Sequence, residues 1–138
     1  MNPQQVHIIV LAADATIRQS IAGIASGQEG LRVEVVPDAP GLIEALSGST
    51  AAVVIDESAE PAYLSLIRRI RKTSPGVDAT VVGGPKSDLV RREERAEGVD
   101  LYLERPIDAF TVRAALDHRF SLVALKWRAG IVGRSSGI

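Results

Sequence analysis

The sequence lacks cysteine, and it is poor in aromatic residues and histidine. Its 138 residues include one tryptophan, two tyrosines, two phenylalanines and two histidines. Without cysteine neither a disulfide framework nor a thiolate metal site can form, and two histidines do not favour a zinc site. No apolar run approaches the roughly 18 residues that a membrane-spanning helix needs, and no basic residue precedes the first apolar segment as in a secretory signal. We therefore expect a cytoplasmic protein without a membrane span.

The residues that are present have ordinary globular proportions but an uneven distribution of charge. With 46% hydrophobic and 24% charged residues, the chain suits one folded domain and excludes a fibrous or disordered protein. Residues 1–112 hold 11 basic and 16 acidic side chains, a net charge of −5, whereas residues 113–138 hold five and one, a net charge of +4. The basic end predicts a solvated helix face or contact with an acidic partner. Because the acidic body would repel a phosphate backbone, we expect no direct binding of nucleic acid.

Short apolar segments alternate with helical patterns, which predicts an α/β fold with a doubly wound parallel sheet of five strands, flanked by five helices. The expected strands are residues 6–11, 32–36, 51–55, 79–82 and 101–103. The expected helices begin near Asp14, cover about 39–47, open at Pro61, cover about 86–97 before Gly98, and run from Asp108 to about Ala129. The third helix is expected to bury Leu64, Ile67 and Ile70, while Arg68, Arg69, Arg71 and Lys72 face water.

The fifth expected helix is extended beyond what a five-stranded sheet needs. Its apolar stripe continues past the predicted edge of the domain, through Val112, Leu116, Phe120, Val123 and Trp127. The second half of this stripe either folds back on the same domain or pairs with a second copy of the chain. We predict the pairing, and therefore a homodimer through the fifth helix.

Polar residues follow the expected strands at their carboxyl ends, where a doubly wound sheet binds its ligands. Acidic groups and one guanidinium in such a place suit phosphate or metal chemistry better than an apolar ligand. These residues are Ala12, Ala13 and Asp14; Asp56, Glu57 and Ser58; Gly83, Gly84 and Pro85; and Glu104, Arg105 and Pro106.

The order and spacing of these segments resemble the receiver domain of two-component response regulators, over residues 6–120. The matching segments are residues 8–18, 52–56, 66–71 and 98–106. The resemblance implies a flavodoxin-like strand order of 2-1-3-4-5, a histidine kinase as partner, and a role in signal transduction rather than catalysis.

The resemblance makes Asp56 the position that accepts a phosphoryl group. Receivers usually hold Mg²⁺ with two carboxylates directly after the first strand, where this chain has Ala12 and Ala13. Alanine offers no oxygen ligand, so we expect no cofactor, or weakly bound Mg²⁺ with Asp14 and Asp56 as its ligands. Asp14 is alternatively a helix N-cap. Glu57 could likewise lend an oxygen to a metal or be a solvated loop carboxylate.

Three further positions correspond to functional positions of receiver domains, but the residues here differ from the usual ones or lack their usual partner. Gly83 stands where a hydroxyl residue binds the phosphoryl group, and Arg105 stands where receivers have lysine. Arg105 would pair with Asp56 without any metal. Tyr102 matches an aromatic residue that turns inward or outward with the state of the site, and with Gly83 there is no side chain for the ring to follow inward.

The end of the chain carries a second resemblance. Residues 128–138, with Val132-Gly133-Arg134-Ser135, resemble the opening of the AAA+ domain in sigma-54-dependent transcriptional activators. We therefore divide the chain into a receiver-like domain over 1–120 and a linker helix with the start of an AAA+ output domain over 121–138. The alternative for the last residues is a flexible Gly/Ser tail.

Three functions remain open from the sequence. The first is an atypical receiver that signals by dimerisation and controls an attached output domain, with impaired Mg²⁺-dependent phosphorylation. The second is a conventional receiver that is phosphorylated on Asp56. The third is a sensor that binds a small ligand in the space of the missing acidic pair.

Overall fold

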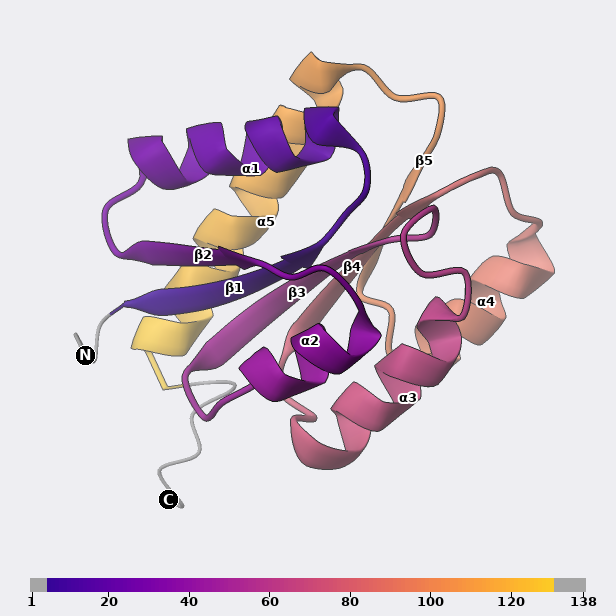
Figure 1. The fold of residues 1–138 in the computed structure, drawn as a ribbon, viewed down its shortest axis with the longest axis horizontal. Coiled ribbons are helices and arrows are strands. Elements are labelled where there is room, and N and C mark those ends of the chain that lie inside the picture. Colours follow the sequence, from indigo (N-terminus) through magenta and orange to yellow (C-terminus); the bar gives the residue numbers. More distant parts are fainter. Residues whose placement is uncertain (1–4, 131–138) are drawn as a thin grey trace.

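The computed structural model describes residues 5–130. The chain folds into a five-stranded parallel sheet that lies between two layers of helices (Figure 1). The strand order is β2-β1-β3-β4-β5, so the predicted fold class and order are confirmed. Among the residues described, no helix is both long and apolar enough to cross a membrane. The strands are β1 Val6–Leu11, β2 Leu31–Val35, β3 Thr50–Asp56, β4 Asp78–Gly83 and β5 Leu101–Glu104. The helices are α1 Ala15–Gly27, α2 Ala39–Ala45, α3 Tyr63–Thr73, α4 Asp88–Glu97 and α5 Ala109–Arg128.

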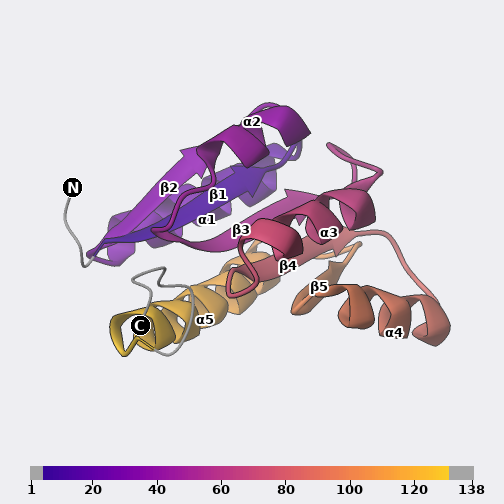
Figure 2. The same cartoon turned by 90° about the horizontal axis from the view of Figure 1, so that it is seen from below.

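The two helical layers bury separate hydrophobic clusters. Helices α1 and α5 cover one face of the sheet, α2 and α3 cover the other, and α4 lies beside α3 (Figures 1 and 2). Strands β1 and β3 are buried along their whole length because they lie inside the sheet and are covered on both faces. Each predicted strand is present to within one residue at either end. Parallel pairing places the carboxyl ends of β1, β3, β4 and β5 along one edge.

The third helix differs from the prediction in its start and its buried face. It begins at Tyr63 rather than Pro61, and Leu66 is buried where Leu64 is only half-buried. The reason is Tyr63, which is buried and sets the phase of the helix. Arg71 does not face water, because its guanidinium donates to the carbonyl of Pro75 and forms an ion pair with Asp100 at 2.8 Å.

Helix α5 has the predicted length, but its apolar stripe does not overhang the domain. Val112, Leu116, Phe120, Val123 and Trp127 are all buried within the chain, and Trp127 is only 4% exposed. The stripe packs against α1 and the sheet in one continuous cluster. The reasoning that required a second copy to cover this stripe was therefore wrong. The segment 131–138, which carries the second resemblance, lies outside the described residues.

Candidate functional site

The candidate site lies at the carboxyl edge of the sheet, where three elements bring Asp14, Asp56 and Arg105 together. Asp56 is the last residue of β3, Asp14 is the N-cap of α1, and Arg105 directly follows β5. Asp14 caps its helix through Oδ1, which accepts a hydrogen bond from the Thr16 amide at 2.8 Å. Its Oδ2 accepts from the Arg105 guanidinium at 3.1 Å. The N-cap prediction for Asp14 is therefore confirmed, and the other oxygen of Asp14 binds Arg105.

Asp56 is a buried carboxylate whose oxygens already have donors. Its exposed fraction is 0%, and Oδ1 accepts from the Ser58 hydroxyl at 2.7 Å and the Ser58 amide at 3.0 Å. Oδ2 accepts from the Asp14 amide at 3.2 Å, and Arg105 lies 3.0 Å from Oδ1. Burial by itself would raise the pKa of Asp56, but the Ser58 donors, the Asp14 amide and Arg105 together lower it. Asp56 is therefore an ionised group at neutral pH.

One guanidinium group binds both acidic side chains. The same Arg105 nitrogen lies within 3.1 Å of Asp14 and 3.0 Å of Asp56, so the ion pair expected from the sequence is present. Burial would lower the pKa of Arg105, and the two carboxylates more than offset that effect. Arg105 places a positive charge between the carboxylates without a metal ion.

The residues at this edge do not fit Mg²⁺. The positions of the missing acidic pair present only the backbone carbonyls of Ala12 and Ala13, which accept from the Arg18 guanidinium at 3.0 and 3.3 Å. Among residues 5–130, no group of three or more acidic or histidine side chains is placed to hold a metal. Mg²⁺ requires near-octahedral oxygen coordination, whereas here guanidinium groups bind both backbone carbonyls and one oxygen each of Asp14 and Asp56. A role for Arg18 at this site was not predicted from the sequence, although Arg18 lies one helical turn after the Asp14 cap.

Glu57 is not a solvated loop carboxylate, because both of its oxygens have partners in the protein. Its Oε1 accepts from the Gly84 amide at 3.0 Å, and its Oε2 binds the Lys86 ammonium at 2.7 Å. Burial would raise the pKa of Glu57, but Lys86 and the Gly84 amide lower it. The solvated alternative for Glu57 was wrong because Gly84 and Lys86 of the β4–α4 loop bind it. Lys86 is a second residue of the site that sequence reasoning did not select.

Tyr102 occupies the space that a side chain at position 83 would fill. Its hydroxyl donates to the Gly84 carbonyl at 2.6 Å, and a Cβ built on Gly83 would lie 2.4 Å from that hydroxyl oxygen. The ring is half-buried and lies under the Arg91 guanidinium, 5.1 Å from the ring centroid. The absence of a side chain at Gly83 is what admits the hydroxyl, and the predicted lack of coupling between the ring and the state of the site stays a prediction.

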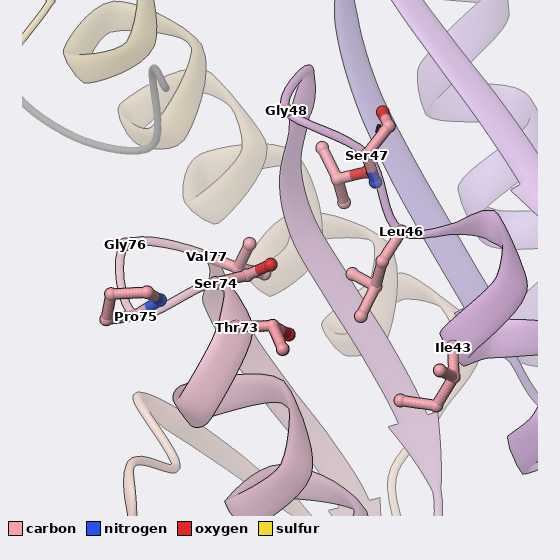
Figure 3. Close-up of a pocket in the computed structure, with 10 residues that line it drawn as sticks. Ile43, Leu46, Ser47, Gly48, Thr73, Ser74, Pro75, Gly76 and Val77 are labelled. Carbon is pink, nitrogen blue, oxygen red and sulfur yellow. Dashed lines mark hydrogen bonds between the residues drawn. The ribbon is translucent and has the colours of Figure 1, made fainter. Parts of the chain in front are cut away.

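A larger cleft of about 760 Å³ lies at the opposite, amino end of β3 and β4 (Figure 3). It is lined by α2, the loop before β3 and the loop before β4. None of its lining residues is charged; they are Ile43, Leu46, Ser47, Gly48, Thr50, Thr73, Ser74, Pro75, Gly76 and Val77. This cleft therefore offers nothing for phosphate or metal chemistry, and the carboxyl edge remains the candidate site.

Comparison with known proteins identifies the fold. No protein-family model matches the sequence, and no curated protein matches it. Among solved structures, a CheY-like receiver domain of a response regulator from Methanospirillum hungatei is 19% identical with a TM-score of 0.69, covering 91% of this chain and 98% of that one. The receiver domain of the Francisella response regulator 1452 is 21% identical, with a TM-score of 0.69 and coverage of 88% and 98%.

Structures of the larger protein NtrX from Brucella abortus are also similar. One, in complex with ADP, is 21% identical with a TM-score of 0.67 over 91% of this chain. This chain spans 28% of the length of that NtrX chain. At these identities the comparisons show that residues 5–130 have the receiver-domain fold.

Proposed function

We propose that this chain is an atypical receiver domain that signals through protein contacts and in which Mg²⁺-dependent phosphorylation of Asp56 is impaired. The observation that carries the proposal is the Arg105 guanidinium, which lies 3.0 Å from Asp56 and 3.1 Å from Asp14. Phosphoryl transfer to a carboxylate needs a metal ion that shares the charge of the incoming phosphoryl oxygens. Here the oxygens that would hold such an ion bind a side chain of the protein instead.

The alternative is a conventional receiver that is phosphorylated on Asp56. One observation favours it, namely that the lowered pKa of Asp56 leaves the carboxylate ionised and therefore able to act as a nucleophile. Ser58 and Arg105 both bind Oδ1, so attack on phosphorus would fall to Oδ2, which accepts one hydrogen bond, from the Asp14 amide at 3.2 Å.

Treatment with acetyl phosphate and Mg²⁺, followed by intact-protein mass spectrometry, separates the two functions. We expect the wild-type mass to remain unchanged. Asp56→Asn is the matched control, because it keeps the shape of the side chain and removes the nucleophile. Rapid gain of one phosphoryl group by the wild type, absent in Asp56→Asn, would establish the conventional receiver.

The partners of this domain are part of the proposal. The fold is shared with NtrX, of which this chain spans 28%, and this supports an attached output domain such as the AAA+ domain of sigma-54-dependent activators. We also propose a homodimer through α5, now by its outer face, where Phe110 is 84% and Leu125 is 67% exposed. Sedimentation equilibrium tests the dimer, because Phe110→Glu and Leu125→Glu should each give a monomer. An unchanged mass in both variants would exclude this face.

A further inference from the structure

Helix α4 buries a carboxylate instead of an apolar side chain. Its one buried residue is Glu94, which is 1% exposed. Oε2 of Glu94 accepts from the Tyr63 hydroxyl, whereas Oε1 has no hydrogen-bond partner among the described residues. The Nε of Arg91, one turn earlier on the same helix, is also buried and without a partner. Buried polar groups are nearly always satisfied, so this acceptor and this donor are available to a polar ligand.

These two side chains line a cleft of about 200 Å³ between α4 and β5. Strand β5 is the edge strand of the sheet. The cleft is lined by Arg91, Glu94, Arg95, Val99, Asp100, Leu101 and Tyr102. Its size suits a small metabolite, since drug-sized ligands occupy roughly 300–1,000 Å³. Asp100 forms an ion pair with Arg71 at 2.8 Å. Glu94 is therefore the acceptor available to a ligand, and Arg91 and Arg95 are the available donors.

The charges of the cleft select the class of ligand. A simple anion would face the buried Glu94 carboxylate, and a simple cation would face Arg91 and Arg95. A molecule that carries an ammonium group and a carboxylate a few bonds apart satisfies both, because its ammonium can donate to Glu94 and its carboxylate can accept from Arg91.

Arg91 is held in the cleft by two weak contacts. Its guanidinium is stacked 5.1 Å from the centroid of the Tyr102 ring and binds Glu104 at 3.1 Å. Both contacts involve partly exposed groups, and stacking and ion pairs of this kind contribute little to stability. The Arg91 side chain can therefore turn toward a ligand carboxylate at small cost.

We propose that the cleft between α4 and β5 binds a small zwitterion of the amino acid class, with its ammonium on Glu94 and its carboxylate on Arg91 and Arg95. This inference goes beyond the proposed function and does not depend on whether Asp56 is phosphorylated. The cleft adjoins Tyr102, whose hydroxyl binds the Gly84 carbonyl, so binding takes place next to the carboxyl edge of the sheet.

Isothermal titration calorimetry of the chain with L-alanine, ethylamine and propionate tests the proposal. Ethylamine and propionate each keep the apolar part of alanine and one of its two charges. We expect saturable binding of alanine, at least roughly tenfold tighter than that of either analogue, because each analogue forgoes one hydrogen bond to a charged group. No saturable binding of alanine, or equal binding of all three compounds, would overturn the assignment.

Variants on α4 locate the binding. Glu94→Gln keeps the shape of the side chain and should weaken alanine binding about 10- to 100-fold, as loss of a charged hydrogen-bond partner does. Arg91→Lys should also weaken it, and Glu93→Gln, an exposed neighbour on the same helix, should not. Thermal unfolding confirms that each variant is folded. Equal affinities in Glu94→Gln and Glu93→Gln, or a crystal soaked with alanine that shows only a water between Glu94 and Arg91, would refute the site.

Discussion

At the scale of single residues, the most informative position is Arg105. Its charge lies between two carboxylates, one of which has no exposed surface, so the guanidinium compensates for the burial of Asp56. Under the function proposed above, the contact that stabilises the ionised acid is also the one that keeps Mg²⁺ from its oxygens.

Removal of this guanidinium should destabilise the protein. We expect Arg105→Met to lower the free energy of unfolding by about 1.5–3 kcal/mol, the range for hydrogen bonds to charged groups, because Asp56 then lacks its counter-ion. Urea denaturation at neutral pH measures the change. Arg92→Met, at an exposed position on α4, serves as the control and should change stability by less than about 0.5 kcal/mol. Equal effects of the two substitutions would show that the pairing with Asp56 contributes nothing.

Gly83 and Tyr102 should be coupled. Gly83→Ala places a methyl group 2.4 Å from the Tyr102 hydroxyl and 2.7 Å from Glu57, and such overpacking typically costs about 1–3 kcal/mol. In a Tyr102→Phe background the first contact is absent, so the same substitution should cost less. A double-mutant cycle by urea denaturation measures the interaction energy. Additive effects would mean that the hydroxyl does not occupy this space in solution.

At the scale of elements, His7 connects three strands of the sheet. It lies in β1, its Nδ1 is 2.9 Å from the Thr50 hydroxyl on β3, and its Nε2 is 3.0 Å from Glu34 on β2. Burial lowers the pKa of His7 from 6.5, although the hydrogen bond to Glu34 opposes this. The folded state therefore favours the neutral imidazole more than the unfolded state does.

This difference predicts a loss of stability in mild acid. Because the pKa of His7 is lower in the folded chain, its contribution is complete above about pH 6.5 and declines as the pH falls toward the folded value, by at most ~1.4 kcal/mol per pH unit. Urea denaturation between pH 7 and pH 5 measures the slope. His7→Gln should flatten it, whereas His118→Gln, at an exposed position on α5, should leave it unchanged. The lowered pKa values of Asp14, Asp56 and Glu57 act at lower pH, where these carboxylates protonate.

At the scale of the whole molecule, stability should be independent of Mg²⁺. The ligands that would couple folding to metal binding are absent at Ala12 and Ala13, so Mg²⁺ should leave the Tm of the wild type unchanged relative to KCl at equal ionic strength. The double variant Ala13→Asp with Arg105→Lys restores a carboxylate and removes the bridging guanidinium. Its Tm should rise with Mg²⁺, by roughly 4 °C for each 1 kcal/mol of linked binding. A saturable rise in the wild type would show that its carboxyl edge holds the ion after all.

The sequence by itself determined the layers and the order of the elements. Apolar segments such as 6–11 and 51–55 can be buried on both faces only inside a sheet, and the caps at Asp14 and Gly98 set helix ends through local hydrogen bonds and backbone geometry. Such signals act between residues that are close in sequence, and they can therefore be predicted from the sequence alone. The position of the candidate site at the carboxyl ends follows from the same alternation of strands and helices.

Only the tertiary structure decided how the side chains are used. The last turns of α5 fold back on the domain, so Trp127 is buried in the chain's own core, because the area available on α1 and the sheet cannot be read from helical spacing. Likewise, Lys86 joins the site and the Tyr102 hydroxyl fills the space beside Gly83, through contacts between residues far apart in sequence. Such contacts depend on distances of a few ångströms across separate elements, and only the packed chain sets those distances.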